Sequence, residues 1–345
     1  MFVPEPFHVR RPRLVAPVRV DSTGRRGPTR GQARGPGWRR TGQGLYVPAH
    51  VDRTPDQRIV EAAAVLHPGE AVTGWAGLRW QGAGWFDGTA GPARLRAVPV
   101  LARRDRAAPP GAVVSQEFLH PDEITTLDDV PLTVSVRSVV YEMRYAATLG
   151  DAVIALDMAC YADLVSLAEV SAYVAALGPV TGIQQARDAL ALGEENSWSP
   201  RESAMRGIWT RRAGLPRPLC NVPVFTLDGR HIGTPDLIDP ELGLAGEYNG
   251  ADHITLAGTA ADLKKEAAYR ELGLEVVTML VTDWPELDDF TRRLQEAARR
   301  AGARSGPRRW TVEPPSWWAP THTVEHRRAL REPERQRLLR YRRTA

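Results

Sequence analysis

Hydrophobic and polar residues alternate with a period of two in three short runs in the second half of the chain, a pattern typical of β-strands. Asp228-Gly229 separates the first two runs and is a favoured two-residue hairpin turn. Asp239-Pro240-Glu241 provides the next turn. The sequence therefore predicts three antiparallel strands, at residues 222–227, 230–238 and 244–249.

Predicted helices surround these strands. Ser199 and Pro200 mark a helix start, with an N-cap followed by proline at the first position, and Glu202 completes a capping box. Gly214 is the matching stop signal. Beyond the strands, the spacing predicts a helix over 260–272, a strand over 274–281 and an amphipathic helix over 287–301. The resulting order of elements is α-β-β-β-α-β-α.

Residues 51–193 are predicted to form a mostly helical domain. Its first helix starts at the capping residue Thr54 and ends at Pro68. Further elements are expected in this domain: β segments at residues 94–101 and 113–118, then helices at residues 137–147, 151–161, 168–177 and 182–192. Its tryptophans are expected in the core, with a base-stacking stripe as the alternative: Trp75, Trp80 and Trp85.

Length and composition exclude several classes of protein. A chain of 345 residues with 43% hydrophobic residues suggests two domains with real cores. No run approaches 18 apolar residues, so no membrane span is predicted, and Pro and Arg occupy the first 20 residues in place of a signal segment. Cys160 and Cys220 are too far apart for a disulfide framework or a zinc site. These features indicate a cytoplasmic protein.

The net charge of +4 is distributed unevenly. Residues 1–50 carry +8 and residues 321–345 carry +5, so the chain between them is acidic. Basic ends on an acidic body fit contact with nucleic-acid phosphates. The alternative is that solvated ends collect charge in a chain that uses Arg almost throughout in place of Lys. Six residues are candidate DNA contacts: Arg30, Arg34, Arg39, Arg40, Lys264 and Lys265.

Two carboxylates are expected to face each other across the second hairpin. If its turn is symmetric, Asp236 and Glu247 are equidistant from the centre, which places their Cβ atoms about 4.5–5.5 Å apart. Like charges so close repel unless a cation lies between them, and Mg²⁺ or Mn²⁺ suits one or two carboxylates completed by waters. Asn249 shares a face with Glu247 because side chains alternate along a strand.

The pattern Pro-Asp, ten residues, Glu-x-Asn resembles the PD-(D/E)xK signature of restriction endonuclease-like nucleases. The segment from Glu247 to His253 is also similar to the E-x-D-G-x-x-H strand of the Vsr-like branch. This resemblance implies a restriction endonuclease-like fold in which Asp236 and Glu247 bind the metal. Asn249 stands where a carboxylate or lysine is expected. The implied catalytic residues are Asp236, Glu247, Asn249, Glu202 and His253.

Purely structural explanations of several of these residues stay open. Glu202 is also explained as an ordinary helix cap, and His253 as a surface or core histidine. Lys264 and Lys265 are the only lysines of the chain. In a nuclease, one of them would replace the missing strand lysine. The alternative is that both belong to a solvated helix face.

A second resemblance concerns the first half. The segment from Trp38 to Pro48 is predicted to form a basic hairpin that contains Trp38 and Tyr46, which is similar to the wing of the AbiEi family of antitoxin-like transcriptional regulators. Residues 71–80 and 151–157 resemble the body of actinobacterial members. This resemblance implies a DNA-binding regulator with a cognate toxin as partner.

The expected protein is α+β, with a mostly helical AbiEi-like N-terminal half and a restriction endonuclease-like α/β C-terminal domain. Two functions stay open: a Mg²⁺-dependent DNA endonuclease, and a catalytically inactive DNA-binding regulator or antitoxin. The tail combines an ordered Pro/Trp-rich strap over 310–320 with a basic helix over 327–343. The expected divisions are residues 1–50, a basic arm; 51–193, the helical domain; 196–302, the nuclease-like domain; and 303–345, the strap and tail.

Overall fold

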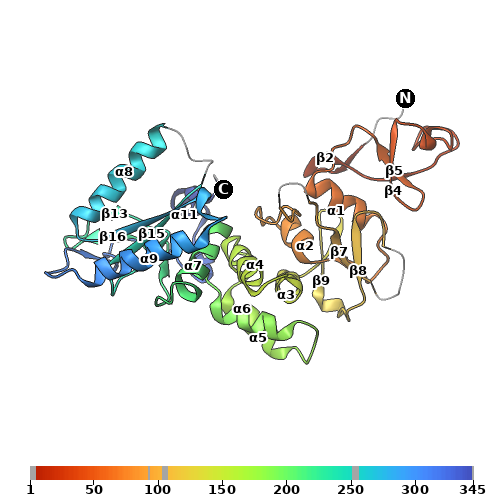
Figure 1. The fold of residues 1–345 in the computed structure, drawn as a ribbon. Coiled ribbons are helices and arrows are strands. Elements are labelled where there is room, and N and C mark those ends of the chain that lie inside the picture. The colour runs from red at the N-terminus through yellow and green to blue at the C-terminus, as the bar shows by residue number, and fades with distance from the viewer. Residues whose placement is uncertain (1–4, 92–93, 103–107, 251–255, 344–345) are drawn as a thin grey trace. The chain divides into compact units, whose positions relative to one another are not determined.

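The computed structural model describes residues 5–91, 94–102, 108–250 and 256–343, and the chain forms two compact units (Figure 1). The N-terminal unit comprises residues 1–147 and 168–187, and the C-terminal unit comprises residues 148–167 and 188–345. These units do not follow the predicted boundary near residue 195, because a helix at Leu149–Tyr161 belongs with the C-terminal unit. No helix among the described residues is both long and apolar enough to cross a bilayer.

A five-stranded mixed sheet forms the centre of the N-terminal unit, with strand order β8-β7-β6-β10-β9. The expectation of a mostly helical domain is therefore wrong for residues 51–133. β7 and β8 overlap the β segments predicted at 94–101 and 113–118, whereas β6, β9 and β10, of two to four residues each, are too short to produce a recognisable alternation. Their bounds are β6 Ala71–Val72, β7 Val98–Leu101, β8 Ala112–Ser115, β9 Ile124–Leu127 and β10 Val130–Thr133.

Apart from the helix over Gly74–Trp80, the helices of this half were predicted. Thr54 caps α1 (Pro55–Ala63) by accepting the Gln57 N–H, and α2 (Gly74–Trp80) follows β6. The four helices expected after the sheet are all present: α3 Ser135–Tyr145, α4 Leu149–Tyr161, α5 Leu167–Ala176 and α6 Ile183–Leu192.

Two of the three tryptophans are core residues. Trp75 and Trp80 are fully buried, and their indole N–H groups donate to the backbone carbonyls of Ala97 and Leu127, both at 2.8 Å. Buried indoles with satisfied N–H groups are structural. Trp85 differs, since it is 37% exposed.

Short strands precede the five-stranded sheet. The predicted hairpin around Gly44 is confirmed as the pair β4–β5, in which Arg40 lies opposite Tyr46. Between β3 and β4, the Asp21 carboxylate accepts the backbone N–H groups of Arg25 and Arg26, both at 2.9 Å, which orders this loop. The strands are β1 Pro6–His8, β2 Arg11–Val15, β3 Val18–Arg19, β4 Trp38–Gly42 and β5 Leu45–Pro48.

The C-terminal unit contains a four-stranded sheet in the order β11-β14-β15-β16 and a three-stranded sheet in the order β13-β12-β17. β14 and β15 pair antiparallel, while β15 and β16 pair parallel. The four-stranded sheet consists of β11 Leu219–Cys220, β14 Leu237–Asp239, β15 Leu244–Asn249 and β16 Glu275–Leu280. The smaller sheet consists of β12 Val224–Thr226, β13 His231–Gly233 and β17 Trp310–Thr311.

The predicted continuous strand over 230–238 is wrong, because β13 and β14 divide it between the two sheets. Thr234 and Pro235 lie at the break, and proline has no N–H to donate to a ladder.

Helices cover both faces of the four-stranded sheet. One face packs on α7 (Pro200–Arg211) and α9 (Leu287–Gly302) through Trp209, Met279 and Phe290. The core on the other face includes Ile238, Ala245 and Tyr269, the last of which lies on α8 (Leu256–Glu271). The helix predicted over 260–272 is thus present and begins earlier than expected.

The tail is ordered against the C-terminal unit. Trp317 and Trp318 contact the Phe225 ring edge-on, at centroid distances of 6.0 and 5.2 Å, which confirms an ordered strap. The single basic helix expected over 327–343 is wrong: α10 (Val324–Ala329) and α11 (Glu332–Leu338) are separated by extended backbone at Leu330 and Arg331. Pro333 accounts for the break, since in a continuous helix its ring would clash with the Ala329 carbonyl and it has no N–H to donate to that carbonyl.

Candidate active site

The β14–β15 hairpin has the predicted register. Leu237 pairs with Gly246, Ile238 with Ala245 and Asp239 with Leu244, so Asp236 and Glu247 occupy the next opposed positions. Alternation along the strands places both side chains on the face of Ile238 and Ala245, which is the face that α8 covers. The sequence argument for a carboxylate pair on one face is therefore supported by the fold.

A lysine from α8 reaches this pair. The ammonium of Lys265 lies 2.9 Å from the Glu247 carboxylate, and both side chains are partly buried, with exposed fractions of 29% and 16%. Lys264, its neighbour in sequence, is exposed. The two lysines thus have different environments, and the interpretation of both as a solvated helix face is wrong for Lys265.

The Asp236 carboxylate is oriented by the backbone of the neighbouring strand. Its Oδ2 accepts the N–H of Tyr248 at 2.6 Å, at the point where the β14–β15 ladder ends. Hydrogen bonds to a charged acceptor are short and strong, so this one fixes the direction in which the carboxylate points.

Glu202 approaches from the start of α7 and has a double role. Its carboxylate accepts the Trp198 N–H at 2.8 Å and the side-chain amide of Asn221 at 2.7 Å, while its own N–H donates to the Ser199 hydroxyl. The N-cap predicted at Ser199 is therefore present, but the Glu202 carboxylate accepts the N–H of Trp198 instead of the Ser199 N–H that the predicted capping box would use. Burial, and then the negative charge of Asp236, raise the pKa of Glu202 to about 8, so this carboxyl is largely protonated at neutral pH.

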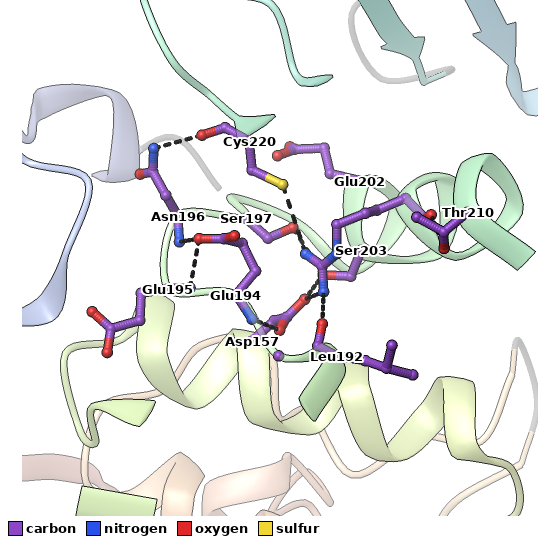
Figure 2. A network of polar contacts seen from close by, with 12 residues as sticks. Asp157, Leu192, Glu194, Glu195, Asn196, Ser197, Glu202, Ser203, Thr210 and Cys220 are labelled. Atoms are coloured by element: carbon purple, nitrogen blue, oxygen red, sulfur yellow. Dashed lines mark hydrogen bonds and ion pairs between the residues drawn. The ribbon is translucent and has the colours of Figure 1, made fainter. Parts of the chain in front are cut away.

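A buried polar network fixes the first turns of α7 (Figure 2). The guanidinium of Arg206 lies 2.8 Å from the Asp157 carboxylate, which also accepts the Ser203 hydroxyl at 2.6 Å and the Glu194 N–H at 2.7 Å. Arg206 further donates to the Leu192 carbonyl. Because Ser203 and Arg206 follow Glu202 on one helix, this network holds the helix that presents Glu202.

The remaining predicted site residues have different outcomes. Asn249 ends β15 and shares the face of Glu247 by alternation, as expected. His253 lies outside the described residues.

The candidate DNA contacts divide into two groups. Both terminal nitrogens of Arg39 donate to Glu61 at 2.8 Å, so its guanidinium is held within the fold, and its role as a DNA contact stays a prediction. Arg40 donates to the Gly42 carbonyl at 3.0 Å and its side chain is exposed. Arg30 and Arg34 are exposed on the loop that Asp21 orders.

Sequence reasoning missed two residues beside the carboxylates. Tyr269 follows Lys265 by one helical turn, a spacing that places both side chains on the same face of α8. Asn221 donates its backbone N–H to the Asp236 carbonyl at 3.0 Å and its side-chain amide to Glu202. The i,i+4 spacing identifies Tyr269 once Lys265 is placed, whereas nothing local in the sequence identifies Asn221.

The donor set suits a hard cation with few protein ligands. Asp236 and Glu247 offer carboxylate oxygens on one face, and the effect of Asp236 on Glu202 shows excess negative charge there. Across the described ranges, no group of three or more His, Cys, Asp or Glu side chains has the geometry of a metal site. Among the described residues, an ion bound here would take Asp236 and Glu247 as its carboxylate ligands and complete its shell with water or substrate oxygens.

Comparison with protein-family models, with curated proteins and with solved structures found no match to this chain. What the site does is therefore argued from its own geometry.

Proposed function

We propose that the C-terminal unit is a Mg²⁺-dependent endonuclease domain that hydrolyses DNA phosphodiesters. One observation carries the proposal: Asp236 and Glu247 occupy opposed positions on one face of the sheet, and the Lys265 ammonium lies 2.9 Å from Glu247. Two carboxylates and one lysine on a rigid hairpin and helix are the residue types that metal-assisted phosphodiester cleavage needs. The proposal includes a restriction endonuclease-like fold for this unit and an AbiEi-like fold for the first half of the chain.

The cation would be held by Asp236 and Glu247 and would supply a bound water of lowered pKa together with stabilisation of the phosphate charge. Lys265 brings a positive charge to the same face, where it neutralises a phosphate oxygen. Glu202, protonated at neutral pH, keeps the cluster from carrying a third negative charge. Asn249, whose amide accepts no proton, orients the attacking water.

Plasmid cleavage by the purified full-length protein tests this proposal. The wild type should nick or linearise supercoiled DNA with Mg²⁺ or Mn²⁺ and not with EDTA. Asp236→Asn should abolish cleavage, and Lys265→Met should lower it by roughly 10²–10³-fold, the usual loss when one group that stabilises transition-state charge is removed. Lys264→Met is the matched control, because Lys264 is exposed on the same helix, and it should cleave like the wild type.

A second candidate function is a DNA-binding regulator that has kept the fold and lost the chemistry. Asn249 favours it, because neither a carboxylate nor a lysine stands at that position of the strand. Asn249→Asp separates the two candidates: it should increase cleavage by a weakened nuclease. In a degenerate scaffold it should only destabilise the carboxylate cluster. A wild type that binds DNA and cleaves it with neither metal would support the regulator.

A further inference from the structure

Tyr269 combines full burial with an unsatisfied hydroxyl. The side chain has no exposed area, and its ring packs with Ile238, Ala245 and Val276. Within the described residues the hydroxyl has no hydrogen-bond partner. A buried hydroxyl of this kind costs stability and calls for an explanation.

Gly233 leaves the space that the Tyr269 hydroxyl occupies. A Cβ added at Gly233 would lie 2.6 Å from the Tyr269 oxygen and 3.0 Å from Cγ of Lys265. Any side chain at position 233 would therefore displace the tyrosine or the lysine. Glycine at this strand end keeps both α8 side chains against the sheet.

Tyr269 is buried within electrostatic reach of two carboxylates. Burial, followed by the negative charges of Glu247 and Asp236, raises the pKa of Tyr269 well above its ordinary value. The hydroxyl therefore keeps its proton and acts as a donor near two carboxylates. Glu247 is the stronger of these two influences, and Lys265, one helical turn from Tyr269, is bonded to Glu247.

We propose that Tyr269 is a positioning residue for Glu247, whose carboxylate accepts the Tyr269 hydroxyl when a divalent cation draws it away from Lys265. The exchange lets the Lys265 ammonium turn to a phosphate oxygen. This inference about Tyr269 rests on the proposed function, since it assigns Tyr269 to the same metal-binding carboxylate. Carboxylates that bind metals are usually oriented by such donors, whose removal weakens metal binding by about 10–100-fold.

Calorimetric titration of the metal-free full-length protein with Mg²⁺ tests the exchange, with thermal melting of the same samples. Tyr269→Phe should weaken Mg²⁺ binding by about 10–100-fold. Without metal it should melt at the wild-type temperature or above it, because the unsatisfied hydroxyl is gone. Tyr161→Phe is the matched control: it removes another buried tyrosine hydroxyl of the C-terminal unit, at the end of α4, and should bind Mg²⁺ like the wild type.

Gly233→Ala provides a second variant. Its methyl group meets the Tyr269 oxygen, so it should weaken Mg²⁺ binding in the wild type and weaken it less in the Tyr269→Phe background, where that oxygen is absent. Equal effects in the two backgrounds would count against a role for the hydroxyl.

The outcomes separate this inference from the proposed function. If Tyr269→Phe binds Mg²⁺ as tightly as the wild type, the inference is overturned whether or not DNA is cleaved. If the wild type binds Mg²⁺ and cleaves no DNA, the proposed function fails, and the comparison of Mg²⁺ affinities still decides the role of Tyr269. A wild type that binds no Mg²⁺ overturns both.

Discussion

The two basic ends of the chain look alike in sequence and are used differently in the structure. Near the N-terminus, Arg25, Arg26, Arg30 and Arg34 are exposed on one ordered loop, and residues 22–51 contain no acid. Near the C-terminus, Arg328, Arg331, Arg337 and Arg340 are also exposed, but other arginines turn inward. Three of them converge on the carboxylate of Asp163: Arg327, Arg335 and Arg342.

The difference lies in burial. Arg327 has no exposed side-chain area, lies 2.6 Å from Asp163 and donates to the carbonyls of Thr321, Cys160 and Glu195. Its charge is used to hold the tail to the end of α4. The net charge of a segment therefore says little about the charge that it exposes. The exposed arginines of the N-terminal loop have no acid between residues 22 and 51, whereas exposed Glu325 and Glu332 lie among those of the tail.

The largest effect expected from this comparison is on Arg327. Arg327→Met should lower the free energy of unfolding of the C-terminal unit by about 3–5 kcal/mol, because it leaves buried carbonyls and part of a carboxylate without their donor. Arg331→Met, in which an 83% exposed side chain is replaced, should stay within about 0.5 kcal/mol of the wild type. Urea denaturation measures both, and similar midpoints for the two variants would contradict the comparison.

A buried carboxyl should behave differently from the buried guanidinium of Arg327, because burial favours the neutral form of Glu202. The folded pKa of Glu202, about 8, lies above its ordinary value of 4.5, so the stability that the neutral carboxyl provides is complete below pH 4.5 and is lost as the pH rises through 8. Glu202→Gln should melt like the wild type near pH 5 and be more stable near pH 9, by on the order of a few kcal/mol. Parallel melting curves across this pH range would show that Glu202 titrates normally.

Arg39 and Arg40, adjacent on β4, offer the same comparison between a paired arginine and an exposed one. Arg39→Met should cost about 1.5–3 kcal/mol, because it breaks two charge-assisted hydrogen bonds to the buried carboxylate of Glu61. Arg40→Met should change the free energy of unfolding by less than about 0.5 kcal/mol. Denaturation of the N-terminal unit measures both, and an equal loss from the two variants would show that burial does not distinguish them.

The smallest effect on stability is expected from the exposed loop. Replacing Arg25, Arg26, Arg30 and Arg34 together with Gln should leave the free energy of unfolding within about 0.5 kcal/mol. The same variant should lower the slope of log affinity for duplex DNA against log salt by about 0.9 for each DNA phosphate that the loop no longer neutralises. Fluorescence titrations at several salt concentrations measure this slope. An unchanged slope would make the loop ordinary solvated surface.

Local signals in the sequence predicted local structure well. The cap at Ser199, the turn at Asp239 and the alternation up to Asn249 correctly placed α7 and the register of Asp236 against Glu247. These features succeed because each depends on residues only a few positions apart. The five-stranded sheet was predicted only in part for the same reason: the segments expected at 94–101 and 113–118 match β7 and β8, whereas β6, β9 and β10 are brief and the pairing of the strands depends on contacts between distant segments.

The periodicity of hydrophobic and polar residues could not predict side-chain contacts between residues far apart in the sequence. Nothing local distinguishes Lys265 from Lys264 until the helix phase relative to the sheet is known. Likewise Arg39 was chosen as a DNA contact for its charge, and its partner Glu61 lies 22 residues away. The symmetry of the predicted hairpin identified Asp236 and Glu247, whereas Asn221 and Tyr269 needed the fold.

The convergence of arginines on Asp163 also affects the order in which the chain can fold. Asp163 and Arg327 are 164 positions apart, so at ordinary rates of synthesis about 10–30 s pass between their appearance from the ribosome. During that interval α4 ends in a carboxylate whose guanidinium partners have not been made. The tail therefore docks beside the end of α4 only after most of the C-terminal unit has been synthesised. A chain shortened before residue 327 would leave the carbonyls of Cys160 and Glu195 without the Arg327 guanidinium, and not merely lack a basic arm.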